Sequence, residues 1–352
     1  GDTIYDDADQ DVVIATIDDA VEPDSSWWRL EISGDHSYIA DGLTVHNASR
    51  FWVGGTGTWD ASDTTHWSAT TGGAGGASVP GASDTVTLDG ASGGGTVTLG
   101  YSPTVTSITE GAHTGTFTAA GFAPTMATFS ATGAGIRTLT MGAGVWTITG
   151  NAATVVNFTT ITNLTLNPDS FNLTYSGAAG TRTIVSGALA EATACNYSIS
   201  AGTDIVAAST VFANLDFTGF AGTLTNVART VYGNLTFSSG MTLTAGGNVT
   251  TVATTSGTKD ITTNNNASLD IGLTFNGAGG TFRLVGNWNG GSARTATLTN
   301  GNVNLNGNTL KTGLVSISTN AITITSGGGG FEVSGNNATI WSCATATNLT
   351  LA

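Results

Sequence analysis

Short strands of alternating apolar and polar residues recur through the chain from about residue 100 onward, separated by one or two small turn residues. A strand of this length cannot bury its apolar face alone, so it needs neighbours stacked on it. Glycine permits the sharp corners between strands. The pattern predicts an all-β fold, a β-solenoid built of β-helix-like repeats. A string of β-sandwich domains is the alternative, because regular short strands also fit sandwiches.

An Asn-Leu-[Thr or Asp]-[Leu or Phe] core recurs within these strands at irregular spacing, at Asn163, Asn214, Asn234 and Asn348. Asn and Thr side chains at repeated positions can hydrogen-bond from one coil of a solenoid to the next. We therefore expect ladders of Asn and Thr between neighbouring coils. No segment shows a convincing helical period.

The composition is poor in charge. Charged residues make up 9% of the chain, compared with about 25% in a typical soluble domain, so Thr, Ser, Asn and Gly must form most of the surface. The formal net charge of -15 repels phosphate backbones and anionic lipids, which argues against nucleic acid as a partner. No apolar stretch approaches the roughly 18 residues of a membrane span, so we expect no membrane insertion.

The composition also divides the chain into three parts. Residues 1–47 are acidic and contain apolar runs such as "DVVIATI", which predict a small N-terminal β-rich unit. Residues 48–100 are a Trp/Gly-rich opening module that ends in two alternating strands. Residues 101–352 are the β-repeat shaft. We expect the shaft to continue beyond residue 352, because the final letters "TNLTLA" begin another repeat.

The segment 27–48, "WWRLEISGDHSYIADGLTVHNA", combines elements in a specific order. A strand is followed by Asp35 and His36, the aromatic Tyr38, a "DG" turn, and a second strand that ends in His46 and Asn47. This order resembles the C-terminal block of inteins and related self-cleaving Hint domains. The resemblance implies that the N-terminal unit is an intein-like fragment.

The resemblance assigns self-cleavage chemistry to three residues. The side-chain amide of Asn47 would attack its own carbonyl carbon and break the peptide bond to Ala48. His46 and His36 would transfer protons, because imidazole titrates near neutral pH. Full splicing also requires a nucleophile after the Asn, whereas this chain has Ala48, and no cysteine precedes Cys195. Two interpretations stay open: an inert remnant, and cleavage after Asn47 without splicing.

The segment "RFWVGGTGTWDASDTTHW" resembles the module that precedes β-repeats in structural and fibre proteins of tailed bacteriophages, and "NLTFSSGMTLTAG" resembles their repeats. The resemblance implies a non-enzymatic fibre or spike protein, extracellular on the virion surface, that serves as a spacer or host-surface adhesin. It also implies attachment to other virion proteins at the N-terminal end, a host glycan or receptor as partner, and a homotrimer. Bacterial autotransporter-type adhesins share these features and are an alternative.

Two further groups of residues are candidates for binding or catalysis. Trp52, Trp59 and Trp67 permit two interpretations, a platform that stacks on sugar rings or a cap that seals the end of the core. A polysaccharide-degrading β-helix would need two carboxylates on one groove, and Asp260 and Asp270 are the pair that could lie on neighbouring coils.

No metal or cofactor is predicted. Cys195 and Cys343 lie far apart without a CxxC motif or clustered histidines, so we expect two separate thiols and no metal centre. The acidic run "DDADQD" begins like a calcium loop but lacks the following Gly and the Glu at the end of such a loop.

Overall fold

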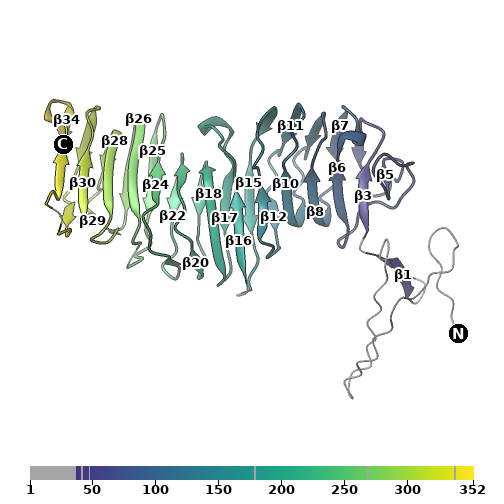
Figure 1. Cartoon of the computed structure of the whole chain (residues 1–352), viewed down its shortest axis with the longest axis horizontal. Helices are drawn as coiled ribbons and strands as arrows, with labels where there is room; N and C mark the ends of the chain where they lie inside the picture. Colours follow the sequence, from purple (N-terminus) through teal and green to yellow (C-terminus); the bar gives the residue numbers. More distant parts are fainter. Residues whose placement is uncertain (1–36, 41–42, 47, 178–179, 268, 337) are drawn as a thin grey trace, which may run out of the picture.

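A computed structural model describes the chain except for residues 1–36, 41–42, 47, 178–179, 268 and 337. From Ser49 onward, short strands stack in parallel into a β-solenoid of about 12 coils. Figure 1 shows these strands lying across the long axis of a rod that runs from purple N-terminal coils to yellow C-terminal ones. Sandwiches consist of antiparallel strands. The parallel pairing therefore confirms the solenoid prediction and shows that the sandwich alternative is wrong.

The rod begins with a single line of parallel strands, which then divides. The first four strands are β3 (Ser49–Trp52), β6 (Thr85–Leu88), β8 (Thr104–Glu110) and β10 (Thr125–Ala131). Strand β10 pairs through its first half with β12 (Trp146–Ile148) and through its second half with β13 (Thr154–Asn157). Because β3 and β6 continue directly into β8, residues 48–100 form the first coils of the same solenoid.

Two lines of strands continue from that division. The line from β12 contains β15 (Ser170–Leu173), β17 (Asn196–Ile199), β19 (Leu215–Asp216), β22 (Leu235–Thr236), β25 (Thr258–Thr262), the second halves of β26 (Gly272–Val285) and β28 (Thr295–Asn304), β31 (Ile322–Thr325) and β34 (Leu349–Leu351). The line from β13 contains β16 (Thr181–Val185), β18 (Ile205–Phe212), β21 (Arg229–Val231), β24 (Val249–Val252), the first halves of β26 and β28, β30 (Leu314–Ile317) and β33 (Trp341–Cys343). Strand β20 (Thr223–Leu224) pairs with the start of β18, and β23 (Thr242–Leu243) pairs with β20.

Smaller parallel sheets close other sides of the rod. One contains β4 (Gly57–Trp59), β7 (Thr96–Leu99), β9 (Thr116–Thr118), β11 (Arg137–Thr140) and β14 (Leu164–Asn167), and another contains β27 (Trp288–Asn289), β29 (Thr309–Thr312) and β32 (Gly330–Val333). Among the described residues, three short 3-10 turns interrupt the strands, at Gly90–Ser92, Glu191–Thr193 and Ala346–Asn348.

The two ends of the described rod differ. At the N-terminal end, β5 (Trp67–Ser68) pairs antiparallel with β3 and covers the edge of the first coil. This pairing satisfies backbone groups that would otherwise form an open sheet edge. At the other end, Trp341 and Leu351 are exposed, at 44% and 73%.

A separate antiparallel hairpin precedes the rod. Strand β1 (Ser37–Ala40) pairs with β2 (Leu43–His46), with Ser37 opposite His46. Within the described part of the chain, neither strand pairs with the solenoid.

The strands form because their sequence alternates as a pleated strand requires. In the two "TVTL" strands β6 and β7, Val and Leu are buried and both Thr side chains face outward. The inward side chains form one continuous core along the rod, with aromatic contacts between coils such as Phe171 on Tyr197, ring centroids 5.1 Å apart. Each added coil therefore buries the apolar face of the one before it.

Glycine is required where corners of successive coils touch. At Gly133, an added Cβ would lie 1.4 Å from the carbonyl oxygen of Gly111 in the preceding coil. Any side chain there would force the two coils apart.

Candidate functional site on the outer face

Of the three residues assigned to self-cleavage, the structure describes only His46. His36 and Asn47 lie outside the described residues. His46 is the last residue of β2, opposite Ser37. Ala48, which follows the candidate cut, is buried at the start of the rod. Self-cleavage after Asn47 therefore stays a prediction.

The three predicted tryptophans pack together inside the first coils. Trp67 contacts Trp52 and Trp59 edge to face, with centroids 5.1 and 4.9 Å apart. Trp52 also stacks on His66 at 4.6 Å. All three indoles are fully buried, so protein covers their faces. This geometry is that of a seal at the end of the core, and it leaves no indole face open to a sugar.

Polar side chains on the outer face form a hydrogen-bonded chain across six successive strands, from β15 to β26. We call it the amide ladder; it consists of Ser170, Asn196, Asn214, Asn234, Asp260 and Arg283. Parallel strands lie about 4.8 Å apart, which brings each side chain within reach of the next coil. The predicted ladder is thus present in this part of the rod.

The central links of the ladder are amide hydrogen bonds. Asn214 Nδ2 donates to Asn196 Oδ1 at 2.6 Å, and the backbone N–H of Asn234 donates to Asn214 Oδ1 at 2.6 Å. The backbone N–H of Asp260 then donates to Asn234 Oδ1 at 2.9 Å. Arg283 closes the ladder by donating two 2.8 Å bonds to the Asp260 carboxylate.

The other two asparagines of the predicted series lie outside the amide ladder. Asn163 precedes β14 in a different sheet, has a left-handed φ of 60°, and donates to the carbonyl oxygen of Ala134. Asn348 donates to the carbonyl oxygen of Thr319 at the C-terminal end of the rod. Both of these bonds reach a backbone carbonyl oxygen in the preceding coil, so all four asparagines hydrogen-bond between coils as predicted, whereas only Asn214 and Asn234 belong to the amide ladder.

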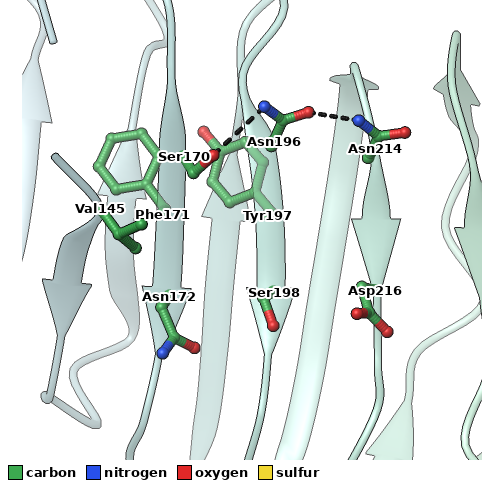
Figure 2. A pocket seen from close by; sticks show the side chains of 9 residues that line it. All are labelled: Val145, Ser170, Phe171, Asn172, Asn196, Tyr197, Ser198, Asn214 and Asp216. Atoms are coloured by element: carbon green, nitrogen blue, oxygen red, sulfur yellow. Dashed lines mark hydrogen bonds between the residues drawn. The ribbon is translucent and has the colours of Figure 1, made fainter. Parts of the chain in front are cut away.

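A shallow groove of about 380 Å³ lies over the start of the ladder, on strands β15, β17 and β19 (Figure 2). Most of its lining surface is apolar, although many of the lining residues carry hydroxyl, amide or carboxylate groups: Val145, Ser170, Phe171, Asn172, Asn196, Tyr197, Ser198, Asn214 and Asp216. Figure 2 shows Asn172, Ser198 and Asp216 in a second row beside the ladder.

The groove combines a mainly apolar lining surface with a few hydrogen-bonding groups. Its hydroxyls and amides can exchange hydrogen bonds with the hydroxyls of a sugar or with a polar peptide. Phe171 and Tyr197 contribute to its floor but are at most 1% exposed, so neither ring is available for stacking. Glycoside hydrolysis generally uses two carboxylates, whereas the described lining contains only Asp216. Thr218 donates to that carboxylate through its backbone N–H and its hydroxyl, at 2.8 and 2.6 Å.

The two carboxylates of the candidate pair each bind a different arginine. Asp260 belongs to the ladder and binds Arg283, whereas Asp270 binds Arg294 at 3.0 Å. The other carboxylates after residue 110 also have partners within the fold: Asp169 with Ser170, Glu191 with Thr254 and Thr255, Asp204 with Arg182, Asp216 with Thr218, and Glu332 with Lys311. Each of these carboxylates is bonded to another part of the fold or to a neighbouring residue.

Glu191 links parts of the chain that are far apart in sequence. Its carboxylate accepts hydrogen bonds at 2.8 Å from the hydroxyls of Thr254 and Thr255, which lie 63 and 64 residues later. Burial alone would raise the pKa of Glu191, but the hydrogen bonds from these threonines outweigh burial, and the pKa lies below its ordinary value. This contact ties the 3-10 turn at Glu191–Thr193 across several coils.

Arginines at inward positions of the strands were not anticipated from the sequence. Arg182 donates to the Asp204 carboxylate at 2.6 and 2.9 Å, and both side chains are fully buried. Arg137 similarly binds the buried Glu110. Arg229 donates to two backbone carbonyl oxygens, and burial lowers its pKa to about 10. The sequence signal for these residues is their position in the strand: each arginine occupies the same alternate positions as the inward-facing apolar residues, as in "TRTIV".

The cysteines are separate thiols, as expected. Cys195 is buried with its Sγ 3.6 Å from Met141 Sδ, and burial raises the thiol pKa to about 12. Cys343 is partly exposed on β33.

Within the described residues, no group of three or more His, Cys, Asp or Glu side chains is arranged to hold a metal ion. None of the helical segments that the structure describes has the length and apolar character of a membrane-spanning helix. No protein family, curated protein or solved structure matches this chain.

Proposed function

We propose that this chain is a structural rod: a fibre or spike component of a tailed-phage virion that acts as a spacer or host-surface adhesin. The observation that supports it best is the single core that continues from the first coil to the last, reinforced on the outer face by the amide ladder. Stacked parallel coils resist bending because each coil is bonded to its neighbours along the whole axis.

The surface chemistry supports the same proposal. The chain has only nine Lys and Arg residues. Three of the arginines, Arg137, Arg182 and Arg229, are buried in the core with their guanidinium groups hydrogen-bonded internally. The outward positions are largely Thr, Asn and Ser. Such a surface gives trypsin-like proteases few sites and binds nonspecifically to few charged partners. The groove over β15, β17 and β19 is a candidate contact for a host glycan.

The shape can be tested by small-angle scattering on the purified full chain. About 12 coils at roughly 4.8 Å each give a rod about 60 Å long. We expect a pair-distance distribution typical of a rod of that length. The measured mass should be three times the chain mass if the chain forms the homotrimer that the resemblance implies. A sphere-like scattering profile would contradict the rod.

The location can be tested by immunogold labelling. An antibody against the rod should decorate fibres or spikes of particles released from a strain that carries the gene. Label on the bacterial surface in the absence of particles would favour the autotransporter-type adhesin instead.

A further inference from the structure

A second row of outward side chains runs beside the amide ladder. Strand pairing places its residues in register on successive coils, and on all but the first strand each lies two positions after a ladder residue. We call it the open row; it consists of Thr147, Asn172, Ser198, Asp216, Thr236 and Thr262. Each of these side chains is half-buried, as expected for an outward position of a strand.

The two rows differ in how their polar groups are used. In the ladder, the Asn196 amide donates to Ser170 and accepts from Asn214, so both ends of the amide are occupied. In the open row, four hydroxyls have no hydrogen-bond partner among the described residues: Thr147, Ser198, Thr236 and Thr262. The ladder is therefore saturated by the protein itself, whereas the open row can bind a ligand.

The other two members of the open row are each held by one atom. Thr218 donates to Asp216 Oδ1 through its backbone N–H and its hydroxyl, at 2.8 and 2.6 Å. The Ser200 hydroxyl donates to Asn172 Oδ1 at 2.9 Å. Within the described part of the chain, Asp216 Oδ2 remains as an acceptor and Asn172 Nδ2 as a donor. Ser198 lies between them and can both donate and accept.

These three groups lie in the groove, one on each of β15, β17 and β19 (Figure 2). Successive coils are about 4.8 Å apart, whereas an extended peptide advances about 3.3 Å per residue and would fall out of step with them. A chain of linked sugar rings advances by close to one coil per ring. A sugar hydroxyl both donates and accepts, so it can pair with an acceptor, a donor or a hydroxyl.

The rest of the groove favours an uncharged sugar. Most of its lining surface is apolar, and Val145, 45% exposed, lies at the end of the groove before β12. Such a surface can bury the C–H face of a sugar ring. The described lining includes the carboxylate of Asp216 and no Lys or Arg, in a chain of net charge -15, so an acidic sugar would be repelled.

We infer that the open row over β15, β17 and β19 binds a neutral oligosaccharide laid along the rod axis. One sugar unit lies over each coil, and Asp216 Oδ2 accepts a charge-assisted hydrogen bond from a sugar hydroxyl. This inference deepens the proposed glycan contact of the groove and rests on it.

The ligand class can be tested with the purified full chain on an array of immobilised linear oligosaccharides. The array carries neutral hexose chains of one to three units and matching chains of uronic acids. We expect binding to neutral chains, with affinity rising from one unit to three because each unit reaches one more coil. Binding to no neutral chain, or preferential binding to the uronic acids, would overturn the inference.

The site can be tested with Ser198→Tyr, which places a bulky ring in the middle of the groove. It should weaken binding of the best neutral chain at least about tenfold. Ser316→Tyr is the matched control, because Ser316 is also the outward third residue of a four-residue strand, β30, but lies outside the groove. Equal binding by the two variants would overturn the site. A change of oligomeric mass in Ser198→Tyr alone would also overturn it, because the groove would then be a contact between copies of the chain.

Asp216→Asn provides a second test that does not depend on the folding of Ser198→Tyr. Asparagine keeps the oxygen that accepts from Thr218 but replaces Oδ2 with an uncharged donor, so binding should weaken about tenfold. Unchanged affinity would overturn the role of Asp216. The scattering experiment separates this result from the proposed function: a chain that scatters as a rod but binds no neutral chain would be a spacer without this site.

Discussion

Replacing Asp204 with Asn removes the negative partner of a guanidinium that has no contact with solvent. The Asp204 carboxylate accepts two bonds from Arg182, at 2.6 and 2.9 Å, and both side chains are fully buried. A buried Nη1 of Arg182 has no hydrogen-bond partner, so its charge depends strongly on Asp204. Asparagine can accept only one of the two bonds, and it carries no charge.

The expected loss in the free energy of unfolding is about 3–5 kcal/mol, the range for breaking a buried ion pair by removing one partner. Asp260→Asn is the matched control, because Arg283 binds Asp260 in the same two-bond geometry with the side chains 44% and 32% exposed. Exposed pairs contribute about 0–1 kcal/mol, so the control should cost little.

Hydrogen exchange is the appropriate assay, because a solenoid can open locally without unfolding as a whole. Amides of β16 and β18, the strands beside the buried pair, should lose protection by about a hundredfold or more in Asp204→Asn. A double variant, Arg182→Met with Asp204→Leu, should recover most of that protection, since it removes both charges together. The reasoning fails if Asp204→Asn and Asp260→Asn lose the same protection, or if the double variant is as unstable as the single one.

Two further predictions follow from titratable groups. In the folded protein, a maleimide should modify Cys343 and leave Cys195 unmodified at pH 8, because Cys195 is buried and its thiol pKa is raised to about 12; two modified thiols per native chain, counted by intact mass, would refute this. Because the folded pKa of Glu191 is depressed, its contribution to stability should be fully present above its unfolded pKa and lost as the pH falls below that value and through the folded pKa. The stability advantage of the wild type over Glu191→Gln in urea unfolding should shrink over that range, and an advantage independent of pH would count against the link to Thr254 and Thr255.

The sequence determined the kind of fold because its signal is local. Alternation in strands such as "TVTL" fixes which side chains share a face, whatever lies around the strand. A short strand with one apolar face must stack, and Gly and Asn at the corners permit the turns. The solenoid, and the ladder through Asn214 and Asn234, could therefore be predicted from these residues.

Only the tertiary structure determined the register of the strands and which strands lie side by side. Bonded partners in adjacent coils lie 18 residues apart for Asn196 and Asn214 but 28 residues apart for Asn172 and Ser200, so no fixed period places one repeat over another. The contact between Ala48 and Asp84, 36 residues apart, depends on the length of the loop between them. Alternation fixes a side chain relative to its own strand, whereas loop length and packing fix which strand lies beside it, and the candidate sites depend on that second choice.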